Sequence, residues 1–143
     1  MPLARYALYA QGVQVYVAPT YDSGEDWLGT LQHIAREGGC WVLGCGNLLR
    51  GVDIPEDLPG RETLYPDPEE WINPGDSVII EPGGKILAGP LHAEDGVLVR
   101  DIDPARSAIA RRTLDVTDHY ARPDIFQLRV NTAEQSPVAF QDE

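Results

Sequence analysis

The stretch from Val13 to Cys45, VQVYVAPTYDSGEDWLGTLQHIAREGGCWVLGC, decides the fold class of this chain. Residues 13–18 alternate valines with other side chains, which predicts a strand. Asp26 is expected to cap a helix over 27–37 that ends at two glycines. One face of this helix carries Trp27, Leu31, Ile34 and Ala35. Residues 40–45 are apolar throughout, which predicts a second strand that is buried on both faces.

Working outward from this stretch, the remaining patterns predict a mixed sheet. Five prolines lie between residues 51 and 74, which indicates a long ordered loop with a short helical turn at 68–71. The sequence Pro82-Gly83-Gly84-Lys85 is a glycine turn and predicts a hairpin. The other expected elements are a helix over 3–10, hairpin strands over 77–81 and 86–88, a strand over 96–101, a helix over 103–114 and a last strand over 127–130. Strands that alternate with helices and then form a hairpin indicate an α/β fold, a mixed sheet covered by helices.

Composition excludes several classes of partner. The 143 residues include 11 Lys or Arg against 23 Asp or Glu, which gives a net charge of -12. A surface this acidic disfavours nucleic acid and anionic membranes, because both are bound through Lys and Arg. No apolar run approaches the roughly 18 residues that a membrane span needs, and no signal peptide is recognised. Only two cysteines are present, and they do not form a disulfide framework, so we expect a cytoplasmic protein.

The residues by themselves contain no complete catalytic constellation. Cys40 and Cys45 are expected to be small buried strand residues, since free cysteine is among the most buried residue types. His33 and Glu37 are four residues apart on one predicted helix face and can pair there. The only lysine, Lys85, is expected to be a solvated turn residue.

No metal or phosphate site is predicted either. His92 and His119 are isolated, and the chain has no His-x-x-x-His or Cys-x-x-Cys spacing. Gly83-Gly84-Lys85 lacks the other residues of a phosphate loop. We therefore expect no metal and no cofactor, and up to this point the sequence implies no reaction.

Several sequence blocks nevertheless resemble nitrilases, which belong to the carbon–nitrogen hydrolase superfamily. They occur in the family's order from Met1 to about Asn131. The blocks are Met1-Pro2-Leu3-Ala4-Arg5, Tyr16-Val17-Ala18-Pro19-Thr20, Trp27 with His33-Ile34-Ala35-Arg36-Glu37-Gly38, Tyr65-Pro66-Asp67, Asn73-Pro74-Gly75-Asp76-Ser77, Pro82-Gly83-Gly84, Ala88-Gly89-Pro90-Leu91 and His119-Tyr120-Ala121-Arg122-Pro123-Asp124. Each block alone is weak, but together they cover nearly the whole chain.

The resemblance implies a fold and a reaction for the complete enzyme. The fold is a four-layer αββα sandwich, in which each sheet takes strands from both halves of the chain. The reaction converts a nitrile into a carboxylic acid and ammonia through a Glu, Lys and Cys triad. The thiolate attacks the nitrile carbon, a thioimidate forms, ammonia leaves, and water releases the acid.

None of the three catalytic residues of the family maps onto this chain. The family's cysteine stands in a Cys-Trp-Glu motif a few residues before the block that here begins at Met1. We therefore expect the chain to be the C-terminal half of a nitrilase, with no catalytic residue in it. Residues 1–131 would form the C-terminal portion of the domain, and residues 132–143 a flexible tail.

The resemblance also implies roles for individual residues. Pro19, which we expect to end the first strand, and Thr20 match family positions near the substrate, a small nitrile. His33, Arg36 and Glu37 lie on a helix through which nitrilases dimerise, so they are candidates for a homo-oligomer interface in a dimer or a spiral.

Alternative functions remain open. The chain could be a nitrilase shortened by gene prediction or by gene breakage, or an inactive remnant that acts only through its interface helices. A sister amidase or a cyanide-hydrolysing enzyme fits the same resemblance. An unrelated binding module on a similar fold is a further alternative.

Overall fold

A computed structural model describes residues 1–138. Five strands form one sheet, and their hydrogen-bonded order is β1, β2, β4, β3. β5 also pairs with β4, along the edge opposite to β2. The strands are β1 (Val15–Thr20), β2 (Trp41–Gly46), β3 (Leu48–Arg50), β4 (Trp71–Ile80) and β5 (Ile86–His92). The helices are α1 (Pro2–Tyr9), α2 (Glu25–Gly38), the 3-10 turn η1 (Gly51–Asp53), α3 (Arg61–Leu64) and α4 (Arg106–Arg111). The predicted α/β class, a mixed sheet with helices against it, is confirmed.

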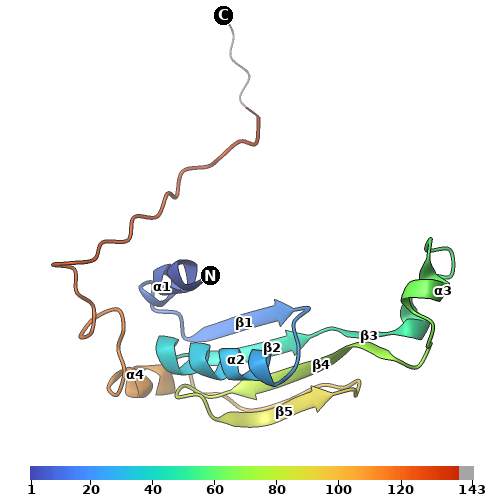
Figure 1. The fold of residues 1–143 in the computed structure, drawn as a ribbon. Helices are drawn as coiled ribbons and strands as arrows, with labels where there is room; N and C mark the ends of the chain where they lie inside the picture. The colour runs from blue at the N-terminus through green and yellow to red at the C-terminus, as the bar shows by residue number, and fades with distance from the viewer. Residues whose placement is uncertain (139–143) are drawn as a thin grey trace, which may run out of the picture.

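The unit that organises the sheet is β1–α2–β2. β1 and β2 are parallel, and α2 connects them across one face of the sheet, as Figure 1 shows. β4 runs antiparallel to β2, β3 and β5. Among residues 1–138, β1 pairs only with β2 and is therefore an edge strand, and this position explains Pro19. We expected Pro19 to end the strand, but it lies inside β1, where an edge strand tolerates a residue without an N–H.

The core lies between α2 and one face of the sheet. α2 contributes Leu31, Ile34 and Ala35, and the sheet contributes residues from β1, β2 and β4. The sheet residues of this core are Ala18, Val42, Val78 and Ile80, joined by Cys40. Gly39 ends α2 in the left-handed conformation, as expected from the two glycines. The N-cap is Gly24 rather than Asp26, which lies in the first turn where a carboxylate favours the helix dipole.

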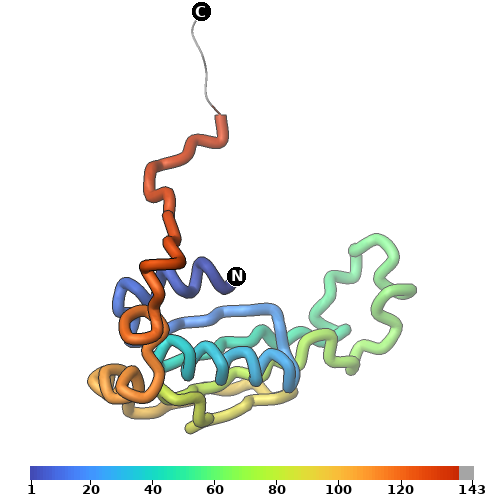
Figure 2. Tube along the Cα trace, turned by 60° about the vertical axis from the view of Figure 1, so that its left-hand side comes forward, coloured from blue at the N-terminus to red at the C-terminus, as the bar shows by residue number. Residues whose placement is uncertain are grey.

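Two segments extend away from the sheet. Figure 1 shows the arm that carries β3, η1 and α3 at one end of the sheet, and the C-terminal segment leaving at the other end. Figure 2, turned by 60°, shows the same separation. The predicted helical turn at 68–71 is wrong. The turn is α3 at Arg61–Leu64, and Trp71 instead begins β4 because it pairs with Arg50 of β3.

Two predicted strands do not form within the described residues. Residues 96–101 lie beside β5 but make no ladder with it. Pro90 offers no N–H, and the pairing of β5 with β4 shifts register three times, so the outer edge of β5 is irregular. Residues 127–130 are exposed and have no strand beside them. A strand without a partner has no ladder to stabilise it.

The end of the chain agrees only partly with expectation. The predicted helix over 103–114 is confirmed in a shorter form, α4. After Arg111 the described chain contains turns but neither helix nor strand. The boundary at residue 131 stays a prediction, and the last part of the expected tail, 139–143, lies outside the described residues. Within residues 1–138, no helix is long and apolar enough to cross a membrane.

Candidate functional site

The carboxyl ends of β1 and β2 form the strongest candidate site. The two strands are parallel, with Pro19 beside Cys45 and Thr20 beside Gly46 at their last positions. In α/β sheets, ligands bind outside the carboxyl ends of parallel strands. The predicted pocket residues Pro19 and Thr20 therefore lie at the kind of position where such sheets bind small molecules.

A small hollow adjoins these strand ends. Its lining comes from the end of β2, the start of β3, the middle of β4, the end of β5 and the segment that follows β5. The lining residues are Cys45, Gly46, Asn47, Leu48, Gly75, Ser77, Leu91, Glu94, Asp95 and Gly96. Pro19 and Thr20 do not line this hollow; they lie on the neighbouring strand end. Their predicted role in a substrate pocket stays a prediction.

The backbone at the strand ends is closely packed. The Gly46 N–H donates to Ser77 Oγ at 3.0 Å, and the Asn47 N–H donates to the Thr20 carbonyl at 3.3 Å. A Cβ at position 46 would collide with the backbone of Gly75, so only glycine fits there. The ends of β1, β2 and the first part of β4 therefore form one rigid edge.

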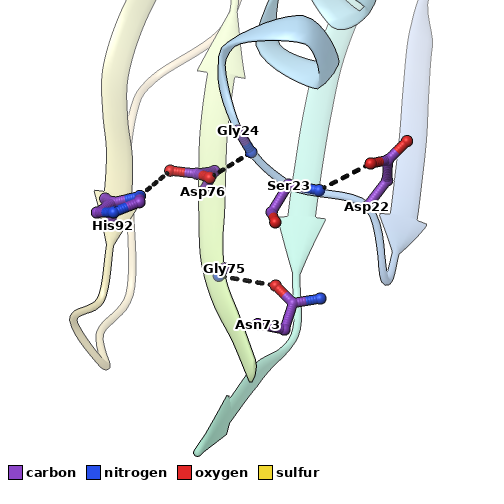
Figure 3. A network of polar contacts seen from close by, with 7 residues as sticks. All are labelled: Asp22, Ser23, Gly24, Asn73, Gly75, Asp76 and His92. Carbon is purple, nitrogen blue, oxygen red and sulfur yellow. Dashed lines mark hydrogen bonds and ion pairs between the residues drawn. The ribbon is translucent and has the colours of Figure 1, made fainter. Parts of the chain in front are cut away.

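The loop between β1 and α2 is held by two side chains of β4, Asn73 and Asp76. Figure 3 shows the contact of Asp76 with Gly24. Asn73 is 1% exposed; its Nδ2 donates to the Tyr21 carbonyl, and its Oδ1 accepts from the Gly75 N–H at 3.0 Å. Asp76 Oδ2 accepts from the Gly24 N–H at 2.7 Å. The two ends of residues 21–24 are thus fixed to the same strand.

Polar contacts within the loop complete this arrangement. Thr20 Oγ1 accepts from the Asp22 N–H at 2.9 Å, and Asp22 Oδ1 accepts from the Ser23 N–H at 3.0 Å. Residues 20–24 therefore turn sharply from the end of β1 into the start of α2, with the Thr20 hydroxyl occupied by the loop itself.

Asp76 has a second partner on β5. Its Oδ1 lies 2.8 Å from His92 Nδ1, and the Asp76 side chain is 2% exposed against 61% for that of His92. A buried carboxylate needs such partners because it loses its hydration. His92 was expected to be isolated, and that interpretation is wrong: the fold brings it to a carboxylate 16 residues away.

Sequence reasoning missed the roles of Asn73, Asp76 and His92, because it placed Asn73 in a loop and began the strand only at residue 77. The structure buries Asn73 and Asp76 within β4, and a buried polar residue requires a hydrogen-bond partner. The sequence does not say which partner, because the loop that supplies it lies 52 residues away.

The predicted interface residues lie together on α2 but differ in what they contact. Glu37 accepts a hydrogen bond from the Tyr9 hydroxyl at 3.1 Å and pairs with Arg5 at 3.5 Å, both on α1. Burial and the Glu37 carboxylate raise the pKa of Tyr9, so this hydroxyl keeps the proton that it donates. The expected pairing of His33 with Glu37 is confirmed, with 3.5 Å between His33 Nε2 and Glu37 Oε1. Glu37 thus joins α1 to α2, whereas His33 and Arg36 are exposed.

The two cysteines have different surroundings. Cys40 is buried as expected, and burial raises the pKa of its thiol to about 11, against the opposing effect of Arg111. The prediction that Cys45 is buried is wrong, because it is exposed. It lies at the end of β2 on the face that α2 does not cover, beside the edge strand. Neither cysteine is in a disulfide.

Within residues 1–138, no group of three or more His, Cys, Asp or Glu side chains is placed to hold a metal ion. Lys85 is exposed in the turn between β4 and β5, as expected for a solvated residue.

Comparison with known proteins identifies similar sequences along the whole chain. Residues 1–112 match the family described as carbon-nitrogen hydrolase. The bifunctional nitrilase/nitrile hydratase NIT4A of Nicotiana tabacum is 41% identical over 146 residues, which cover 98% of this chain and 41% of the relative. Nitrilase 3 of Arabidopsis thaliana is 42% identical over 143 residues, covering 98% of this chain and 41% of the relative.

A bacterial relative shows the same relation. The aliphatic nitrilase of Sinorhizobium fredii is 39% identical over 138 residues, which cover 96% of this chain and 44% of the relative. The chain thus spans about two fifths of the length of the curated relatives that it matches.

Proposed function

The chain belongs to the carbon–nitrogen hydrolase family, and on that premise we propose that it is the part of a nitrilase that forms one wall of the substrate pocket. The observation that supports this proposal is the similarity to nitrilases at about 40% identity over nearly the whole chain. In the proposed reaction, a nitrile and two molecules of water give a carboxylic acid and ammonia.

In this proposal the residues of the chain bind and orient the substrate rather than react with it. The Glu, Lys and Cys groups that the resemblance implies would lie outside this sequence. Pro19 and Thr20, at the end of β1, would lie beside the substrate, and the loop over 21–24 would form the rim of the pocket. The shared edge of β1 and β2 supports this placement, since it brings these residues next to the hollow that Cys45 lines.

A chimera tests the proposal. This chain would replace the 138 aligned residues of the Sinorhizobium fredii aliphatic nitrilase. We expect the chimera to release ammonia from aliphatic nitriles, and the chain alone to release none above buffer. The unmodified aliphatic nitrilase serves as the reference. A chimera that folds but releases no ammonia from any aliphatic or aromatic nitrile would overturn the proposal.

We also propose that α1 and the exposed side of α2 form a contact with a second copy of the chain. Exposed apolar residues on and before α1, namely Met1, Leu3 and Leu8, support this proposal. Since Glu37 is held by α1, the charged contacts would come from His33 and Arg36. The alternative of an inactive remnant that acts only through these helices relies on the same surface.

Charge reversal tests this interface. Arg36→Glu combined with His33→Asp should shift the sedimentation coefficient towards the monomer, whereas Arg129→Glu, an exposed arginine near the end of the described chain, should not. If the sedimentation coefficient stays the same in the double variant, or changes equally in the double variant and in Arg129→Glu, the interface is contradicted.

We also propose that the protein is cytoplasmic, and the two free cysteines support that location.

A further inference from the structure

The conformation of Asp76 is costly for the residue type that occupies it. Its φ is +66°, in the left-handed region, and Gly75 before it has φ +94°. A side chain other than that of glycine destabilises this conformation, although Asp and Asn tolerate it better than most. Glycine would satisfy the backbone alone, so the presence of a carboxylate points to a function of the side chain.

The carboxylate of Asp76 connects two segments across β4. One oxygen accepts from the Gly24 N–H at 2.7 Å, and the other lies 2.8 Å from His92 Nδ1. Gly24 is also the N-cap of α2, so the contact fixes the point at which the loop becomes a helix. Asn73 holds the other end of the loop through the Tyr21 carbonyl. Figure 3 shows Asp76 lying between His92 and Gly24.

We propose that Asp76 is a positioning residue that holds loop 21–24 as a rigid rim beside Thr20, and that this rim limits which nitriles fit the site. The inference relies on the proposed function for the nature of the ligand. The position of the loop does not depend on it. Asp76 acts through the Gly24 N–H and does not touch the substrate.

Hydrogen–deuterium exchange of the 143-residue chain, resolved at single amides, tests the positioning. Asp76→Gly keeps the backbone conformation and removes the carboxylate, so the Gly24 amide should exchange about tenfold faster, the effect expected of losing one charged hydrogen bond. Asp76→Asn should restore slow exchange, because the amide oxygen can accept from the Gly24 N–H while its Nδ2 faces His92 Nδ1. The Val42 amide of the core should be unchanged in both variants.

A matched control separates this effect from the general loss of a carboxylate. Asp53 Oδ2 accepts from the Arg50 N–H at the same 2.7 Å, but it lies on the distant arm. Asp53→Gly should leave exchange at Gly24 unchanged. Equal exchange in Asp76→Gly and the native chain, or failure of Asp76→Asn to restore it, would overturn the inference. If Asp76→Gly does not fold, the native chain still decides: Gly24 must exchange more slowly than the neighbouring Ser23.

A separate measurement tests whether the rim limits which nitriles fit. Butyronitrile and benzonitrile, as aliphatic and aromatic probes, should differ in how far they slow exchange over 20–24 in the native chain and in Asp76→Asn. In Asp76→Gly that difference should disappear. No slowing by either probe in the native chain would remove the substrate role from the rim. Ammonia release by the chimera tests the proposed function independently of these exchange measurements.

Discussion

On the face of the sheet that α2 covers, Val42 and Val78 are fully buried, whereas on the opposite face Val17 is 64% exposed. The same strands make both faces, because successive side chains of a strand point to opposite sides. The cysteines repeat the contrast: Cys40 lies in the core under α2, and Cys45 is exposed at the end of β2. Burial in this chain is therefore set by what covers a face rather than by how apolar its residues are.

The difference also shows where function can reside. The covered face is filled by α2, so its residues can only stabilise the fold. The opposite face keeps Cys45 and Val17 accessible beside a hollow shared with Leu91 and residues 96–98. The candidate site at the strand ends adjoins this less covered face, where side chains are free to meet a ligand.

The largest contrast between the faces is expected in thiol reactivity. At pH 8, a thiol with a pKa of about 11 is ionised to only about one part in a thousand. Burial adds the requirement that the core must open before a reagent enters. Cys45 should therefore react at least about a hundredfold faster than Cys40 with a maleimide, measured by mass spectrometry of the native chain. Comparable rates would show that the faces do not differ in solution.

Stability provides the second test, with one residue type on each face. Val42→Ala should lower the free energy of unfolding by about 2–3 kcal/mol, because it removes two buried methyl groups and leaves a cavity. Val17→Ala should lower it by less than about 1 kcal/mol. Urea unfolding measures both. A loss at Val17 as large as that at Val42 would mean that another surface covers this face in solution.

The third test adds a methyl group to the covered face instead of removing one. A Cβ at Gly44 would lie 2.7 Å from Leu31 Cδ1 and 3.0 Å from Val78 Cγ1, inside the packed core. Gly44→Ala should therefore lower stability by about 1–2 kcal/mol through overpacking. Gly29→Ala is the matched control, since nothing lies within 4 Å of its Cβ. On a helix it should be neutral or slightly stabilising in thermal unfolding.

The smallest effect at neutral pH comes from the Cys40 thiol, because its pH dependence is confined to alkaline solution. The pKa of Cys40 is raised by burial from 9.0 to about 11 in the folded chain. Between these values the unfolded chain loses the proton that the folded chain keeps, so stability falls as pH rises through this window. Below about pH 9 the contribution is fully present. Cys40→Ala should flatten the slope of stability between pH 9 and 11, and Cys45→Ala should not.

Local sequence patterns predicted an element correctly where the residues that define the element lie close together in the sequence. The alternation near Val15, the apolar stripe of α2 and the glycine turn before Ile86 all predicted elements that the structure contains. β3 was missed because three residues just before the proline-rich loop are too few to show a periodicity. It forms only because Leu48 and Leu49 find partners on the first half of β4.

The sequence by itself determined the strand–helix–strand unit, the hairpin, the α/β class and the family resemblance, because these depend on short-range periodicity and on ordered motifs. Only the tertiary structure decided that Cys45 is exposed, that residues 96–101 form no strand, and that Asp76 lies between His92 and Gly24. The physical reason is that coverage of a face, a free strand edge and the partner of a buried carboxylate are supplied by residues distant in the chain. A local pattern shows that a residue needs a partner, and only the packed chain provides it.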